Sequence, residues 1–168
     1  MKLLLCTLAL AAAGCGYHIS GRADTLPKTI HTIAVPAFSN VTTRYQFARE
    51  LSEDVTREMI SRTHYQIISD PNAADAVLKG AVINYAAYGT TVAPTGQATG
   101  VEVIVTVQFS LTNRATGKVL LERKSYEIRE RYQVSVNPET YFDESGTAMQ
   151  RVSRDAARSI VSAILENF

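Results

Sequence analysis

Residues 101–113 read V-E-V-I-V-T-V-Q-F-S-L-T-N, and every second position from Val101 to Leu111 is apolar. Successive side chains of a strand point to opposite faces, so this alternation predicts a strand with one buried face and one polar face. Burial of one face only is typical of antiparallel sheets. A turn carrying Gly117 follows at 113–118, and residues 119–134 return as the next strand. The stretch therefore predicts an antiparallel hairpin that needs a cover on one face.

Two amphipathic segments can supply that cover. Residues 44–62 and 148–168 each carry four apolar side chains at spacings of three or four, which places them on one face of a helix. These side chains are Ala48, Leu51, Val55 and Met59 in the first segment, and Val152, Ala156, Ile160 and Ile164 in the second. Both segments are therefore expected to pack on the apolar face of the sheet.

The segments between residues 29 and 88 complete the predicted fold. Strands are expected within 29–38, at 65–69 and at 76–88, with Pro36 ending the first because it has no N–H to donate. A strand, a helix and a short strand in series indicate a βαβ crossover. The fold class expected is α+β: a two-layer sandwich with two helices on one face of a roughly four-stranded, mostly antiparallel sheet. The sheet opens with the βαβ unit.

The N-terminus has the pattern of an export signal. Lys2 precedes an apolar run that is too short to cross a membrane and ends in Ala12-Ala13-Gly14-Cys15. This ending resembles the bacterial lipobox, with Ala12 where Leu is usual, in which signal peptidase II cuts before a Cys that carries diacylglycerol. An ordinary signal peptide with an incidental Cys is the alternative. The predicted divisions are a signal peptide at 1–14, a lipidated tether at 15–28 and a single domain at 29–168.

The lipid would hold the domain on a membrane. Diacylglycerol and an amide-linked fatty acid such as palmitate provide several chains, each stabilising by about 0.8 kcal/mol per buried CH₂. Gly16, rather than Asp, follows Cys15. By the lipoprotein sorting rule this predicts the outer membrane, with the domain on its periplasmic side.

The composition excludes several classes of function. Lys and Arg number 17 and Asp and Glu number 16, so no basic excess favours nucleic acid as a partner. No Cys follows Cys15, and the three His (His18, His31 and His64) lack metal-ligand spacing. Four carboxylates (Glu50, Glu53, Asp54 and Glu58) are expected on the solvated side of the first helix. No nucleophile motif is present, so we predict no enzyme, no metal and no cofactor apart from the covalent lipid.

Three polar features remain as candidate binding surfaces. Odd-numbered positions of the last strand form a polar row (Arg123, Ser125, Glu127, Arg129 and Arg131), which is either a solvated sheet face or a surface for an anionic ligand or a wet protein lumen. Arg114 and Lys118 form a basic pair at the hairpin turn that would suit phosphorylated sugars. The uncharged segment 89–100 is either a linker between strands or a segment that inserts into a partner.

The segment after the lipidation site resembles a known family. Residues 15–21 read C-G-Y-H-I-S-G, which is similar to the start of mature LPS-assembly lipoproteins of the LptE family. Residues 33–40, I-A-V-P-A-F-S-N, followed by a helix, fit the same pattern, as does the order of elements along the chain. The resemblance covers essentially the whole mature chain, and only Cys15 transfers as a residue.

The resemblance implies a fold of two helices on a four-stranded sheet. It also implies a lipoprotein that plugs the outer-membrane LPS translocon barrel LptD, assists its assembly, binds LPS and helps deliver it to the cell surface. Residues 33–40 also resemble the opening βαβ unit of curli-secretion pore components and of activators of cell-wall synthases. Those periplasmic lipoproteins are the alternative.

Overall fold

The computed structural model describes residues 26–92, 94, 96, 98–134 and 138–166. The signal peptide, Cys15, His18 and most of the tether lie outside these residues. The strands are β1 (Thr32–Ala34), β2 (Ser39–Asn40), β3 (Gln66–Ile68), β4 (Ala76–Val92), β5 (Ala98–Asn113) and β6 (Val119–Gln133), and the helices are α2 (Tyr45–Arg62) and α3 (Pro138–Leu165). No helix of the described part has the length and apolarity needed to span a membrane.

The strands form one mixed sheet in the order β3-β1-β4-β5-β6, with β2 beside β4. β1 pairs in parallel with β3 and β4, so β1, α2 and β3 make the expected βαβ unit. β4, β5 and β6 form the antiparallel part. The α+β class is confirmed. The sheet has six strands rather than roughly four, because pieces as short as β2 carry no period-two signal in the sequence.

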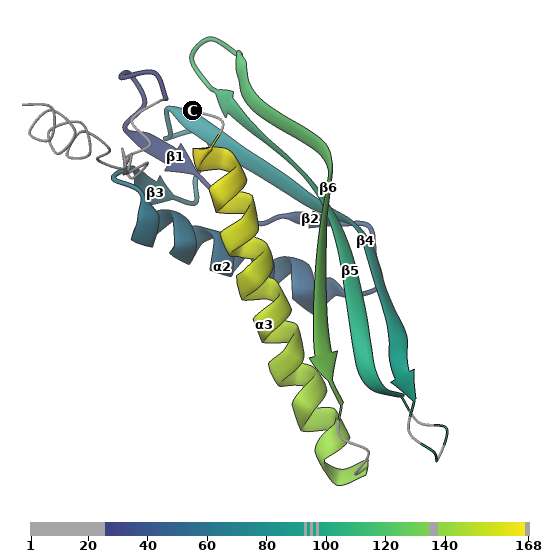
Figure 1. Cartoon of the computed structure of the whole chain (residues 1–168). Helices are drawn as coiled ribbons and strands as arrows, with labels where there is room; N and C mark the ends of the chain where they lie inside the picture. The colour runs from purple at the N-terminus through teal and green to yellow at the C-terminus, as the bar shows by residue number, and fades with distance from the viewer. Residues whose placement is uncertain (1–25, 93, 95, 97, 135–137, 167–168) are drawn as a thin grey trace, which may run out of the picture.

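Both helices cover the same face of the sheet (Figure 1). The apolar residues predicted to face inward from α2 and α3 are all buried, as are Val103, Val105, Val107, Phe109 and Leu111 of β5. We call the uncovered face the open face. Its distal end carries the β4–β5 turn near the start of α3, and its proximal end carries the β5–β6 turn (Figure 1).

A buried polar contact joins the two helices. Ser153 of α3 donates its hydroxyl hydrogen to Asp54 Oδ2 of α2 at 2.6 Å, and Arg57 donates to Oδ1 of the same carboxylate. The expectation that Asp54 lies on the solvated side of the helix is therefore wrong: Asp54 is 6% exposed. The sequence carries the signal, because Asp54 follows Leu51 by three positions and so lies at the edge of the apolar stripe.

Segment 89–100 is mostly strand, rather than a linker between strands. β4 continues to Val92 and β5 begins at Ala98. Gly100 pairs with Thr91, and a Cβ on Gly100 would lie 2.9 Å from the hydroxyl oxygens of Thr90 and Thr91. The glycine that suggests a loop is thus required by the close approach of the two strands.

Two further boundaries differ from expectation. α3 begins at Pro138 rather than at residue 148, which is compatible with proline because the first helical residue needs no N–H partner. At the other end, Leu26 is buried in the main core, so packing already includes a residue of the expected tether. The division into signal peptide, tether and domain stays a prediction.

Gly80 provides a test of the packing between β2 and β4. A Cβ at this position would lie 2.5 Å from the buried ring of Phe38, so we expect Gly80→Ala to lower the free energy of unfolding by about 1–3 kcal/mol through overpacking. Gly146 of α3 has nothing within 4 Å of the same position. Gly146→Ala should instead stabilise by up to about 1 kcal/mol. Urea unfolding of both variants measures this, and equal effects would contradict the packing described.

Candidate functional site

The open face presents a mainly polar surface over β5 and β6 and a mixed polar and apolar one over β4. In the proximal half, cross-strand register aligns Lys79 with Ser110 and Glu122. In the distal half, it aligns Tyr88 with Glu102 and Arg131. Because directly opposed residues share a face, each set is one row of side chains across three strands. The polar face predicted from the alternation in residues 101–113 is present.

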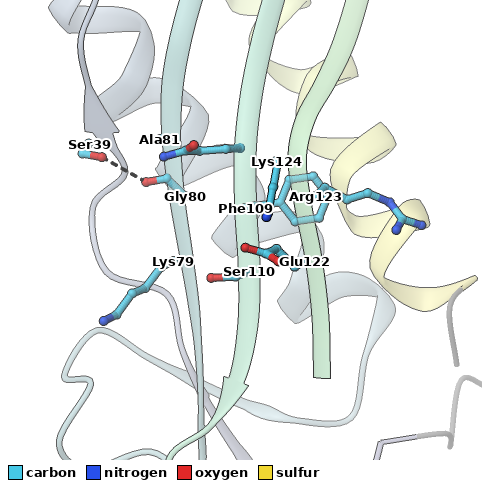
Figure 2. Close-up of a pocket in the computed structure, with 10 residues that line it drawn as sticks. Ser39, Lys79, Gly80, Ala81, Phe109, Ser110, Glu122, Arg123 and Lys124 are labelled. Carbon is cyan, nitrogen blue, oxygen red and sulfur yellow. Dashed lines mark hydrogen bonds between the residues drawn. The ribbon is translucent and has the colours of Figure 1, made fainter. Parts of the chain in front are cut away.

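A depression of about 350 Å³ lies in the proximal half (Figure 2). The polar residues that line it are Ser39, Lys79, Gln108, Ser110, Glu122, Arg123 and Lys124. Ser39 at its edge donates to the Gly80 carbonyl at 3.4 Å. Two ammonium groups, one carboxylate and several hydroxyl and amide groups provide hydrogen bonds for a polar ligand. The depression is therefore suited to binding a polar ligand.

The arginines of the distal half are paired with carboxylates. Arg129 lies 2.7 Å from Glu127, and Arg131 Nε lies 2.9 Å from Glu102. Both arginine side chains are more than half exposed, so each pair contributes at most about 1 kcal/mol to stability. The pairs hold the two guanidinium groups in place and leave these four side chains with no net charge.

Arg123 does not belong to the polar row expected from the odd-numbered positions of this strand. It lies opposite Phe109, which faces the helices, and Figure 2 shows it pointing away from Lys79. A β-bulge lies between the Val107–Tyr126 and Phe109–Arg123 pairs, and a bulge reverses the faces of all residues beyond it. Glu122 and Lys124 line the open-face depression, and Arg123 borders it while its guanidinium group points away from Lys79.

The sequence contains the sign of this bulge. On β6 the inward apolar residue is Leu121, and after it come Tyr126 and Ile128. The step from 121 to 126 changes the parity, which a regular strand does not allow. The same parity leaves Glu127, Arg129 and Arg131 exposed, as the polar row predicts.

The predicted basic pair sits on the β5–β6 turn, and its two members differ. Thr116 N–H and Gly117 N–H both bond to Asn113, and Gly117 has the positive φ of 67° that such a turn requires. Lys118 is exposed. Arg114 is also exposed but has a structural contact: its Nε donates to the Ala74 carbonyl at 2.6 Å. Its role toward phosphate groups stays a prediction.

Arg114 belongs to a junction between the turn and the start of β1. The Arg114 N–H donates to the Asp75 carbonyl at 2.8 Å. The Asp75 carboxylate accepts the backbone N–H groups of His31 and Thr32 and the Thr32 hydroxyl, each at 2.9 Å. These bonds hold the pKa of Asp75 below its ordinary value. The carboxylate thus stays ionised into mild acid and keeps its three donors.

The histidines and the predicted lipidation site are the remaining candidates from the sequence. His31 and His64 are exposed, and among the described residues no three His, Cys, Asp or Glu side chains gather as metal ligands. Cys15, the predicted lipidation site, lies outside the described residues, and its modification stays a prediction.

A family model described as LptE, lipopolysaccharide-assembly, matches residues 30–164. No curated protein matches the chain in sequence. Among solved structures, rare lipoprotein B from Shewanella oneidensis is similar at 19% identity and a TM-score of 0.56, over 80% of this chain and 94% of that one.

Two other structures are similar in fold. A minor lipoprotein from Acinetobacter baumannii has 16% identity and a TM-score of 0.54, over 84% of this chain and 95% of that one. A PelC dodecamer from Paraburkholderia phytofirmans has 18% identity and a TM-score of 0.50, over 79% and 87%. At these identities the structural matches establish the fold alone.

The two basic residues of the turn can be separated experimentally. Arg114→Ala removes the side-chain donor to the Ala74 carbonyl, so we expect the free energy of unfolding to fall by about 1–2 kcal/mol. Lys118→Ala should change it by less than about 0.5 kcal/mol, as is usual for an exposed side chain. Chemical denaturation of both variants measures the difference. A stable Arg114→Ala protein would remove the structural role assigned to that contact.

Proposed function

The chain belongs to the LptE lipopolysaccharide-assembly family, and from that premise we propose that it is an outer-membrane lipoprotein that plugs and helps assemble the LPS translocon barrel LptD. In this role it assists LPS transport to the cell surface and is anchored through lipid on Cys15. Membership in an assembly family agrees with the prediction that the protein is not an enzyme.

The observation that supports plugging most strongly is the open face. Three long strands leave one face uncovered by the helices (Figure 1), and that face carries charged and polar side chains. A bare apolar sheet would aggregate in water, whereas a polar one can remain hydrated. A hydrated barrel lumen is a place where such a face makes wet contacts while the opposite face keeps the core intact.

The contact with LPS is assigned to basic groups at the proximal end. Arg114 and Lys118 on the turn are the candidates for LPS phosphates, and Lys79 and Lys124 at the depression lie on the same half of the sheet. Ammonium and guanidinium groups both bind phosphate by charge-assisted hydrogen bonds. Because Arg114 also holds the junction at Asp75, Lys118 is the position at which binding can be altered without loosening the fold.

The proposal is tested by purifying the full-length, tagged protein from membranes in mild detergent. We expect a large outer-membrane β-barrel of the LptD type to co-purify in about equal amounts with the wild-type chain. The matched control is Cys15→Ala, which should leave the membrane fraction because it lacks the acyl chains. Recovery of a cell-wall synthase without any barrel would contradict the proposal and favour the activator alternative.

A further inference from the structure

The two halves of the open face differ in chemistry. The proximal half presents Lys79, Glu122 and Lys124 around the depression. The distal half presents Tyr88, Ile104, Arg129 and Arg131, which we call the distal surface, and beside them Glu127 and Glu102, which pair with the two arginines. Tyrosine and arginine are enriched in protein–protein interfaces and dominate their binding energy, whereas lysine and glutamate are depleted there. The distal half therefore differs from the proximal half in presenting an exposed aromatic ring, and in presenting arginines where the proximal half has lysines.

The distal surface is arranged as two adjacent rows. Tyr88, Glu102 and Arg131 are aligned across the three strands, and so are Ala86, Ile104 and Arg129. Tyr88 is 57% exposed, and Ile104 is partly exposed beside it in the centre of the sheet. An exposed aromatic ring next to a partly exposed aliphatic side chain gives a central apolar contact with guanidinium groups along one edge.

The guanidinium groups are held in place before any partner binds. Glu127 and Glu102 bind Arg129 and Arg131, which reduces the side-chain entropy that an interface must otherwise remove. The outer N–H groups of Arg131, whose side chain is 76% exposed, can donate to a partner. The two ion pairs are neutral overall, so the surface has no net charge to attract a polyanion such as LPS, and a protein partner is favoured.

The distal surface lies at the other end of the sheet from the first described residue. The first described residue, Leu26, is close in sequence to Thr32, which bonds to Asp75 near the proximal turn. Tyr88 lies twelve residues along β4 from Ala76, or about 40 Å at the rise of a strand. That length exceeds the roughly 30 Å hydrocarbon thickness of a bilayer, so the three long strands are long enough for Tyr88 to lie inside a membrane-spanning barrel while the proximal turn lies outside it.

We propose that Tyr88, Ile104, Arg129 and Arg131 form the surface that docks against the inner wall of the barrel partner. This inference rests on the proposed function and adds the face and residues of contact. The partner chemistry is that of a polar protein wall, with carbonyl or carboxylate oxygens for the arginines and an apolar or aromatic contact for Tyr88.

Site-specific photocrosslinking tests the proposal in the full-length, lipidated protein. A benzoylphenylalanine replaces Tyr88 in one variant and Ile60 in the other. Ile60 is the matched control because it is 59% exposed and lies on α2, in the layer on the opposite face. We expect the probe at 88 to crosslink to the barrel, and the probe at 60 to yield little or no such product.

A second measurement uses Tyr88→Ser with Ile60→Ser as its control, both followed by barrel pull-down and by thermal unfolding. Tyr88→Ser should reduce barrel recovery about tenfold, as expected when a central interface aromatic is removed, with no change in Tm relative to Ile60→Ser. If both variants capture the barrel as well as the wild type does, or if only the probe at 60 crosslinks to it, the distal surface is not the docking surface. The proposed function then remains intact. Crosslinking of position 88 to LPS instead of protein also overturns the distal surface as the docking surface. Failure of the wild type to capture any barrel overturns both.

Discussion

Burial of one face of β5 is the constraint on which the rest of the structure depends. Five side chains of this strand, from Val103 to Leu111, are at most 2% exposed. Each contributes roughly 1.5–3 kcal/mol when fully buried, so together they are comparable to the net stability of a whole domain, about 5–15 kcal/mol. The sheet cannot remain folded without a cover on that face, and α2 and α3 supply it. The buried contact between Ser153 and Asp54 joins those two helices.

The same constraint leaves the other face available for function. With both helices on one side, β4, β5 and β6 carry a polar surface that nothing in the described chain covers except near Val77, where Ala34 and Ala74 form a small second cluster. The bulge in β6 then determines which charges reach this surface, since it brings Glu122 and Lys124 to the depression and sends Arg123 to the helix side. The packing of β6 thus determines which charged side chains lie at the depression.

Most of the fold could be predicted from the sequence because its signals are periodic. The alternation at 101–113 and the helical stripes of Leu51 and Ile160 specify which faces are buried, and the structure confirms them. The predictions that are wrong fall where a local feature interrupts the alternation of a strand or makes it hard to recognise. The parity change on β6 moves Arg123, and the glycines of 89–100 conceal strand pairing. α3 begins at Pro138, ten residues before the start expected from the apolar stripe of the second helical segment.

The candidate site was harder to predict, because it depends on contacts between distant segments. Arg114 reads as a free basic residue in sequence, yet its Nε–H and its backbone N–H donate to the carbonyls of Ala74 and Asp75, about forty residues earlier. Asp54 reads as a surface carboxylate, yet its partner Ser153 lies on the other helix. In contrast, the exposure of Glu127, Arg129 and Arg131 follows from the alternation of side chains along the strand.

In the proposed complex the open face, and not the helix layer, contacts the partner. The most direct measurement is hydroxyl-radical footprinting of the membrane-extracted complex beside the free protein. Tyr88 on the open face and Tyr45 on α2 are both well exposed in the free chain, at 57% and 75%, so both should be oxidised there. We expect Tyr88 to be protected from oxidation in the complex and Tyr45 to stay reactive. Protection of Tyr45 with Tyr88 still reactive would contradict it.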